Sequence, residues 1–364
     1  MTASASELDA RFLAIVRAFA LTDEPLADDV FDALARDTYA YQLERNEPYR
    51  RYVVASGISR APQSWRDIPA VPASAFKDAT LTTFDPAGSE LIFHTSGTTA
   101  RAAGKHYIER AALYDASLLA GFDRFMLADD ARLRYLNLVP NPRDVPHSSL
   151  GYMMGHVGVL RGDGKAAYFL AGDGIDTGGF CKALDAATAA AQPVCIAGTA
   201  FALVALLDEL ATLGRSFAAP PGSRIMETGG FKGRARVVER AELYAGLTRE
   251  LGIPTGAIVA EYGMTELVSQ YYDTPQTRGC ELRVKAGPPW LRTLVIDAGG
   301  NEVADGETGY LRHVDLGNRS SVIAIDTEDR GYRLPEGIVL LGRETAAPPR
   351  GCSLDAEALL GASP

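Results

Sequence analysis

Apolar side chains follow a helical spacing through the first 45 residues of this chain. They recur three or four positions apart at Phe12, Ile15, Val16, Phe19, Val30, Leu34 and Tyr41. This spacing places them on one face of a helix, so we predict helices between about residues 7 and 45. A proline-rich segment, DIPAVPASAF, follows and predicts an extended stretch of chain.

From about residue 90 onward, short apolar runs alternate with amphipathic stretches. The runs that predict strands are LIFHTS, LRYLNLV, AAYFL, PVCIAG, SRIMETGG and AIVAEYG. The clearest helical patterns between them are FALVALLDELATL and ARVVERAELYAGLTREL. This alternation predicts an α/β fold with mostly parallel sheets flanked by helices.

The pattern changes after about residue 280. TLVIDAGGNEV, GYLRHVDL, SSVIAID and GIVLLGR predict short strands joined by Gly, Asn and Asp turns. We therefore expect an α/β core over residues 1–280, a β-rich subdomain of meander or barrel type over 281–343, and a C-terminal tail over 344–364.

Composition narrows the class of protein. The 364 residues carry a net charge of −10, which disfavours a nucleic-acid binder. No apolar run approaches the roughly 18 residues of a membrane span, and the N-terminus lacks the apolar region of a signal peptide, so we expect a cytoplasmic protein. The cysteines show no metal or disulfide pattern, and we expect Cys181, Cys195 and Cys280 to be buried.

A polar segment, HTSGTTARAAGKHY, follows the first of the predicted strands, over residues 94–107. Its hydroxyl and backbone N–H groups can wrap phosphate oxygens, with Lys105 adding a positive charge. A plain connecting loop fits this composition equally well. It is not a Walker A loop, because six residues separate Gly97 from Gly104 and His106 stands where Ser or Thr would bind magnesium.

A second polar turn ends the segment AIVAEYGMTE, over residues 257–266. Thr265 and Glu266 fall just beyond the carboxyl end of a strand, where open α/β sheets bind ligands. A carboxylate beside a phosphate loop suits Mg²⁺, although a solvated Glu at a helix start fits the same residues.

Two more segments add candidate nucleotide contacts. Gly229 and Gly230 permit a close approach of a flat ligand such as adenine, or simply form a tight turn. Asp329 can accept hydrogen bonds from ribose hydroxyls, and Arg343 offers a planar fork for phosphate or ribose. Each of these, taken alone, also fits an ordinary turn.

In this order, TSGTT, GG, YGMTE, TED and GR resemble the motifs of the adenylate-forming superfamily, which includes acyl-CoA synthetases and adenylation domains. A narrower resemblance covers about residues 28–355. YAYQLERNEPYRRY, DIPAVPASAFK and GRETAAPPRGCSL are similar to the LuxE-type acyl-protein synthetase family, with phenylacetate-CoA ligases as more distant relatives.

The resemblance implies a ligase that uses ATP and Mg²⁺. A carboxylic acid becomes an acyl-adenylate with release of pyrophosphate, and the acyl group then forms a thioester with a protein thiol. The implied nucleotide-binding residues are Thr95, Ser96, Gly97, Thr98, Thr99, Gly229, Gly230, Phe231, Tyr262, Gly263, Met264, Asp329 and Arg343. The other implied roles are catalysis by Thr265 and Lys105, metal binding by Glu266, and an acyl pocket lined by Gly198 and Thr199. His147 is implied as a catalytic residue near the acid, and a structural histidine fits that position equally well.

The resemblance also carries a departure near the C-terminus. Full-length superfamily members have a mobile C-terminal domain of roughly a hundred residues after the GR hinge, whereas residues 344–364 alone follow it here. We therefore expect the large-domain fold without that full domain and without the catalytic lysine that it brings, and which cation replaces that lysine stays open. The phosphate loop departs too, with Ala100 in place of the usual Gly and extra residues before Lys105, so Arg101 or Lys105 is its implied cation and Lys105 is preferred. In the LuxE-type family a C-terminal cysteine takes the acyl group, which makes Cys352 the implied acceptor; a structural thiol in a tail turn fits it too.

Other functions stay open from the sequence. The acid could pass to CoA, a carrier protein or an amine, or the chain could be a catalytically weak scaffold of a reductase complex. The acceptor protein implied by the resemblance is a reductase or a carrier protein. The sequence does not identify the acid or the oligomeric state, and it disfavours a P-loop kinase.

Overall fold

The computed structural model describes residues 2–22, 25–58, 60–95, 103–129, 131–164, 166–171, 174–229 and 239–343. The chain forms two units. Unit 1 comprises residues 1–121, 264–270 and 286–364, and unit 2 comprises residues 122–263 and 271–285. Each unit has its own hydrophobic core. The predicted segments 1–280, 281–343 and 344–364 divide the chain along its sequence and stay predictions.

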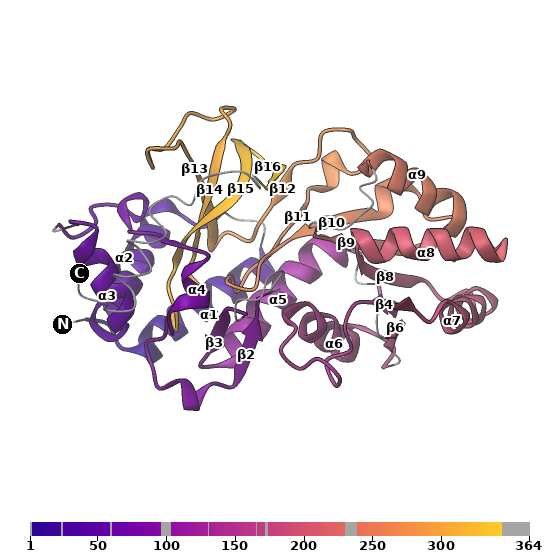
Figure 1. Ribbon diagram of the computed structural model, residues 1–364, viewed down its shortest axis with the longest axis horizontal. Coiled ribbons are helices and arrows are strands. Elements are labelled where there is room, and N and C mark those ends of the chain that lie inside the picture. Colours follow the sequence, from indigo (N-terminus) through magenta and orange to yellow (C-terminus); the bar gives the residue numbers. More distant parts are fainter. Residues whose placement is uncertain are drawn as a thin grey trace. The chain divides into compact units, whose positions relative to one another are not determined.

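Unit 1 begins with three helices that confirm the predicted helical region: α1 (Ala5–Leu21), α2 (Asp28–Arg45) and α3 (Glu47–Ala55). They pack against one another in the indigo part of Figure 1. The side chain of Ser4 caps α1, and that of Asn46 caps α3, in the way that small polar residues satisfy free N–H groups at helix starts. The buried faces of α1 and α2 then supply much of the unit's core.

The C-terminal strands of unit 1 form an antiparallel meander, which confirms the predicted β-rich region. In order across the sheet they are β13 (Leu291–Ile296), β14 (Gly309–Asp315), β15 (Ala324–Leu334) and β16 (Gly337–Arg343). The first part of β15 also pairs in parallel with β1 (Val71–Pro72). That pairing gives the proline-rich segment its extended conformation.

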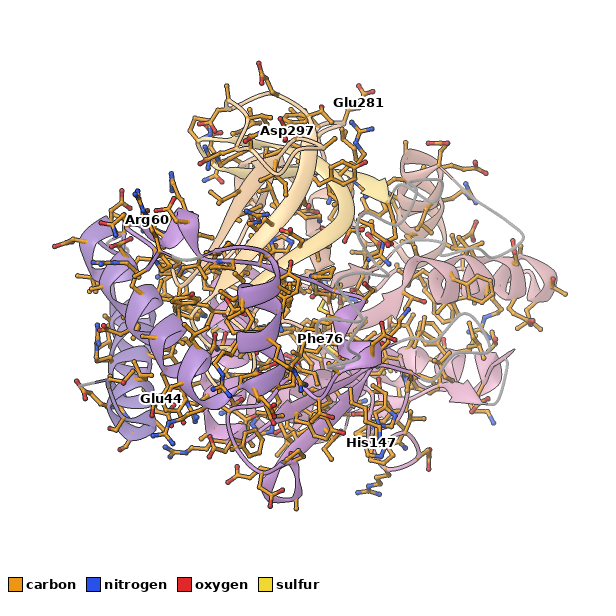
Figure 2. The ribbon with its side chains drawn as sticks, turned by 60° about the vertical axis from the view of Figure 1, so that its left-hand side comes forward. Glu44, Arg60, Phe76, His147, Glu281 and Asp297 are labelled. Carbon is orange, nitrogen blue, oxygen red and sulfur yellow. The ribbon has the colours of Figure 1, made fainter. Side chains whose placement is uncertain are left out.

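A hairpin and one short helix complete the part of unit 1 that matters for function. The hairpin joins β2 (Leu91–His94) to β3 (Lys105–Ile108), with Phe93 opposite His106. The short helix α4 (Ala75–Asp78) lies against it, and Phe76, labelled in Figure 2, meets the His106 ring edge to face at 5.5 Å between centroids. Both His106 and Phe76 are buried, so their contact holds the hairpin against α4.

Unit 2 is the predicted parallel α/β structure. Its sheet runs in the order β11 (Tyr271–Asp273), β10 (Ile258–Tyr262), β9 (Arg224–Thr228), β8 (Val194–Thr199), β4 (Arg134–Leu138) and β5 (Ala167–Tyr168). All neighbours are parallel except β10 and β11. The short strand β12 (Lys285–Ala286) lies beside β11, and β6 (Leu170–Ala171) pairs with β7 (Gly174–Ile175).

The helices of unit 2 pack on this sheet. They are α6 (Ser149–Arg161), α7 (Thr177–Ala189), α8 (Ala200–Leu213) and α9 (Arg240–Leu251), and α5 (Ala111–Met126) passes from unit 1 into unit 2. Apolar faces of α7, α8 and α9 join the strands in one core. Figure 1 shows α8 and α9 side by side. The pattern ARVVERAELYAGLTREL predicted an earlier start for α9, but residues 235–238 lie outside the described residues.

One prediction about cysteine burial is wrong. Cys181 and Cys195 are buried as expected, whereas Cys280 is exposed. Cys280 follows the polar segment Pro275–Thr277 in a turn between β11 and β12. That segment has no apolar periodicity that would draw the thiol into a core. Among the described residues no helix is long and apolar enough to cross a bilayer.

Candidate active site

The hairpin β2–β3 holds both ends of the predicted phosphate loop. The Thr95 N–H donates to the Gly104 carbonyl at 2.9 Å, and the Gly104 N–H donates back to Thr95 Oγ1 at 2.9 Å. A side chain on Gly104 would lie 3.0 Å from the Phe76 backbone, so this close approach requires glycine. Lys105 is exposed at the start of β3. Ser96, Gly97, Thr98 and Thr99, like Arg101, lie outside the described residues.

The Thr265–Glu266 turn belongs to the same unit and is hydrogen-bonded to this hairpin. His106 Nδ1 lies 2.8 Å from the Thr265 carbonyl oxygen, and His106 Nε2 lies 2.9 Å from Asn318 Oδ1. Asn318 Nδ2 donates to the Glu266 carbonyl at 2.8 Å. The Glu266 side chain is largely buried, while Thr265 is partly exposed. Two buried side chains therefore fix the backbone of the predicted Thr-Glu motif.

Asp315 holds the residues that follow the turn. Its carboxylate accepts hydrogen bonds from the N–H groups of Val268, Ser269 and Gly317 and from the Ser269 hydroxyl, all at 2.9–3.0 Å. Burial raises the pKa of Asp315 to about 6, and the hydrogen bonds from Ser269, Gly317 and Val268 act in the opposite direction. The motif is thus anchored on both sides, by His106 and Asn318 at its start and by Asp315 at its end.

The predicted ribose contacts also meet in unit 1. Asp329 on β15 lies opposite Arg343 on β16, and Arg343 Nε donates to Asp329 Oδ1 at 3.1 Å. The Asp329 N–H donates to Thr327 Oγ1, which fixes the strand at this point. A carboxylate and a guanidinium held side by side can bind adjacent hydroxyl and phosphate groups of a nucleotide.

In unit 2, three of the predicted ligand-binding residues lie at, or directly after, the carboxyl ends of neighbouring parallel strands: Thr199, Gly229 and Tyr262. Thr199 on β8 is in register with Thr228 on β9, and Thr228 is in register with Glu261 on β10. Thr199 also caps α8 by accepting from the Ala202 N–H at 3.2 Å. The Thr228 hydroxyl donates a short hydrogen bond to Glu261 Oε2. This edge of the sheet is where parallel α/β structures bind ligands.

The remaining unit 2 predictions concern Gly198, Gly229, Tyr262, Gly263 and His147. Gly198 packs so closely on Leu138 and Leu203 that a Cβ would lie 3.1 Å from the Leu138 side chain, while Gly229 adopts φ +64°. Tyr262 ends β10, and Gly263 connects it to Met264 in unit 1. His147 lies on an exposed turn before α6 and is labelled in Figure 2. Its role near the acid stays a prediction.

Three further predictions fall outside the described residues: Gly230, Phe231 and Cys352. His106, Asn318 and Asp315 were not identified as site residues from the sequence. His106 is recognisable in hindsight only as a polar residue at an inward position of a strand, and Asn318 lies 212 positions away from it. No local pattern links the two.

The Thr265–Glu266 turn offers one carboxylate, a ligand type that suits Mg²⁺. Among the described residues no group of three or more His, Cys, Asp or Glu side chains is placed to hold a metal. Mg²⁺ needs no such group, because it takes one or two carboxylates and completes its shell with water and phosphate oxygens. Glu266, with a fixed backbone and an oxygen donor, is suited to that role.

The sequence matches a known protein family over most of its length. Residues 1–353 match the family described as acyl-protein synthetase, LuxE. The long-chain-fatty-acid–luciferin-component ligase of Aliivibrio fischeri is 24% identical over 83% of this chain and 79% of its own length. The enzyme of the same name from Vibrio harveyi is 23% identical over 88% of this chain and 85% of its own.

The fold is shared with a solved adenylate-forming ligase. An open conformation of 2-hydroxyisobutyryl-CoA ligase, solved with 2-HIB-AMP and CoA, superposes with a TM-score of 0.63 at 15% identity, over 90% of this chain and 73% of that one. The predicted adenylate-forming α/β fold is thus confirmed. Family membership makes this protein an AMP-forming ligase that activates a carboxylic acid with ATP and transfers the acyl group. The chain belongs to the LuxE acyl-protein synthetase family.

Proposed function

We propose that this chain carries out both steps of acyl-protein synthesis with the residues that its sequence motifs single out. The observation that carries the proposal lies in unit 1. There, the Thr265–Glu266 turn is hydrogen-bonded through His106 to the hairpin that begins and ends the phosphate loop. One hydrogen-bond network thus holds the proposed triphosphate-binding loop and the proposed metal-binding carboxylate. This arrangement suits the transfer of a nucleotidyl group.

In the first step, a carboxylate oxygen of the acid attacks the α-phosphorus of ATP. The bond from the α-phosphorus to the bridging oxygen breaks, and pyrophosphate leaves. Such in-line displacement depends on positioning and on neutralising charge. We assign triphosphate binding to Thr95–Thr99 and Lys105, contact with the reacting phosphate to Thr265, and the ribose to Asp329 and Arg343.

Mg²⁺ is part of the proposal, held by the Glu266 carboxylate. When bound, the ion would neutralise phosphate charge as the pyrophosphate bond lengthens. The buried setting of Glu266 favours this role, because a low local dielectric strengthens the attraction between a carboxylate and a cation. His106 and Asn318 hold the backbone that presents the carboxylate.

In the second step, a protein thiolate attacks the acyl carbonyl carbon, and AMP leaves. The proposed acceptor is Cys352, followed by or replaced by a thiol of a partner reductase or carrier protein. Gly198 and Thr199 are proposed to border the acyl group, with adenine near Gly229–Phe231 and Tyr262–Met264. The two curated relatives are named for long-chain fatty acids, which makes fatty acids the first acids to test.

Acid-dependent exchange of pyrophosphate into ATP tests the first step. The purified chain should show exchange with at least one member of a panel of short, long and aromatic acids, and Glu266→Ala should abolish it. Intact-protein mass spectrometry then tests the second step, since an acyl adduct on the wild type should be absent from Cys352→Ser. Exchange without an adduct would favour transfer to CoA, a carrier protein or an amine, and no exchange with any acid would contradict the proposal.

A further inference from the structure

His106 is a buried polar side chain that the proposed reaction does not use directly. Its ring is fully buried, with Nδ1 2.8 Å from the Thr265 carbonyl oxygen and Nε2 2.9 Å from Asn318 Oδ1. We infer that His106, with Asn318, is a positioning residue that sets the Thr265–Glu266 turn relative to the hairpin of the phosphate loop. The inference rests on the proposed function, because the two motifs must act on the same nucleotide for their alignment to matter.

His106 lies close in sequence to one end of the phosphate loop. His106 is two residues from Gly104, which is clasped to Thr95 by two hydrogen bonds of 2.9 Å. The antiparallel pairing of β2 and β3 continues from these two hydrogen bonds, with His94 opposite Lys105 and Phe93 opposite His106. The His106 ring is therefore fixed with respect to both ends of the loop that the proposal assigns to the triphosphate.

The geometry determines which hydrogen bond the His106 ring makes. A carbonyl oxygen can only accept, so Nδ1 must carry a hydrogen to bond with Thr265. Asn318 donates through Nδ2 to the Glu266 carbonyl, which turns its acceptor Oδ1 toward Nε2. A neutral ring with its hydrogen on Nδ1 therefore satisfies the contact with Thr265 and not the contact with Asn318.

Burial supports the neutral ring. Desolvation lowers the pKa of His106 to about 4, so one hydrogen is present at neutral pH, and the geometry places it on Nδ1. The bond to Thr265 is then the one that ties the hairpin to the turn. Asn318 ties the next carbonyl of the turn to its own loop, which Gln42 holds through the Asn318 carbonyl at 2.9 Å.

Three substitutions separate this bond from simple packing. His106→Asn can place its amide N–H where Nδ1–H was, His106→Gln can reach only the position of Nε2, and His106→Phe fills the space with no donor. Tyr49→Phe is the matched control. It removes one buried hydrogen bond of 2.6 Å, from the Tyr49 hydroxyl on α3 to the Pro69 carbonyl of the proline-rich segment, in the same unit.

The measurements are kcat and KM for ATP and for the acid in ATP–pyrophosphate exchange, together with ATP binding by calorimetry and thermal unfolding. We expect His106→Phe and His106→Gln to lose about 10- to 100-fold in kcat, as small misplacements of reacting groups do, with the KM of the acid unchanged. ATP binding without Mg²⁺ should weaken less than threefold. His106→Asn should recover most of kcat, and Tyr49→Phe should lower the unfolding temperature without changing kcat.

Two results would overturn the inference while leaving the proposed function intact. One is a kcat for His106→Phe within about twofold of wild type in a folded protein. The other is a His106→Asn variant as slow as His106→Phe, which would mean that ring packing, and not the bond to Thr265, is what matters. A wild-type protein without acid-dependent exchange would overturn the proposed function and this inference together.

Discussion

Asp329 and Arg343 face each other across β15 and β16, with 3.1 Å between Arg343 Nε and Asp329 Oδ1. The pair differs in exposure, since the Arg343 side chain is 45% exposed and that of Asp329 is 11% exposed. Because the guanidinium end of the pair is open to solvent, we expect the ion pair to add little to stability, and the proposed nucleotide contact to be the property that a substitution changes.

Replacing Asp329 with Asn should therefore affect nucleotide binding more than folding. We expect the KM for ATP to rise about tenfold, because a charged hydrogen-bond acceptor for ribose is lost. The free energy of unfolding should change by less than about 1 kcal/mol. The control is Asp305→Asn, which breaks the neighbouring ion pair with Arg333 and should leave the KM unchanged.

Replacing Glu266 with Gln should separate charge from shape. The amide keeps the volume of the side chain but is a poor ligand for Mg²⁺. We expect kcat for pyrophosphate exchange to fall by about 100-fold, roughly the loss seen when one charge-stabilising group is removed, and the Mg²⁺ concentration for half-maximal rate to rise. Glu336→Gln, in the exposed turn between β15 and β16, is the control. An unchanged Mg²⁺ dependence in Glu266→Gln would remove the metal assignment.

A buried ionic cluster in unit 2 should be costly to break. Asp273 accepts a 2.9 Å hydrogen bond from Lys285, a short one from Arg283, and a 2.7 Å bond from the Ala260 N–H. Lys285 also donates to the Ala260 carbonyl at 2.8 Å, so the cluster extends the hydrogen bonding of β10 where its ladder with β11 ends.

We expect Asp273→Asn to destabilise the protein by about 3–5 kcal/mol, because it leaves two buried cations without their carboxylate. Lys285→Met should cost less, since the pair of Asp273 and Arg283 remains. Urea unfolding measures both, and Asp123→Asn, at the half-exposed pair with Arg161, should cost less than about 1 kcal/mol. Equal effects for Asp273→Asn and Asp123→Asn would contradict the argument.

Because His106 and His313 are buried, we expect the protein to lose stability in mild acid. Burial lowers the pKa of His106 and of His313 to about 4, from 6.5. Because the unfolded chain takes up protons first, the stabilisation is complete above about pH 6.5 and is lost as the pH falls toward 4, by up to about 3 kcal/mol for each ring. Asp315, with its pKa raised to about 6, acts in the opposite direction below that pH.

Unfolding free energies at pH 7, 6 and 5 test this prediction. The wild type should lose stability across that range, and His313→Phe should show a shallower slope. A slope that is the same in both proteins would mean that His313 is not the titrating group.

The three cysteines of the described ranges should differ in reactivity. Cys280 is exposed, while burial raises the pKa of Cys195 to about 12 and also raises the pKa of Cys181. A thiol-reactive reagent should therefore label Cys280 in the native protein and label Cys181 and Cys195 only after unfolding. Peptide mapping after brief maleimide treatment shows which cysteines react in the native protein. Labelling of Cys195 in the native protein would contradict its burial.

The sequence allowed the strands to be located because their apolar runs are buried on both faces, as in LRYLNLV and PVCIAG. It also allowed the meander and the family motifs to be recognised, since each is local. Contacts such as His106 to Asn318 could not be predicted, because they join residues 212 positions apart that no shared period connects. Cys280 was mispredicted because thiols are usually buried, and a polar turn outweighed that preference here.

The chain passes from one unit to the other after residues 121, 263, 270 and 285. Residues 264–270, which carry Thr265 and Glu266, are a seven-residue piece of unit 1 spliced into the sequence of unit 2. No single cut in the backbone can therefore separate the units, and neither can be exchanged between relatives as one continuous stretch of gene. A chimera that exchanges one unit and keeps the other intact must therefore exchange several segments at once.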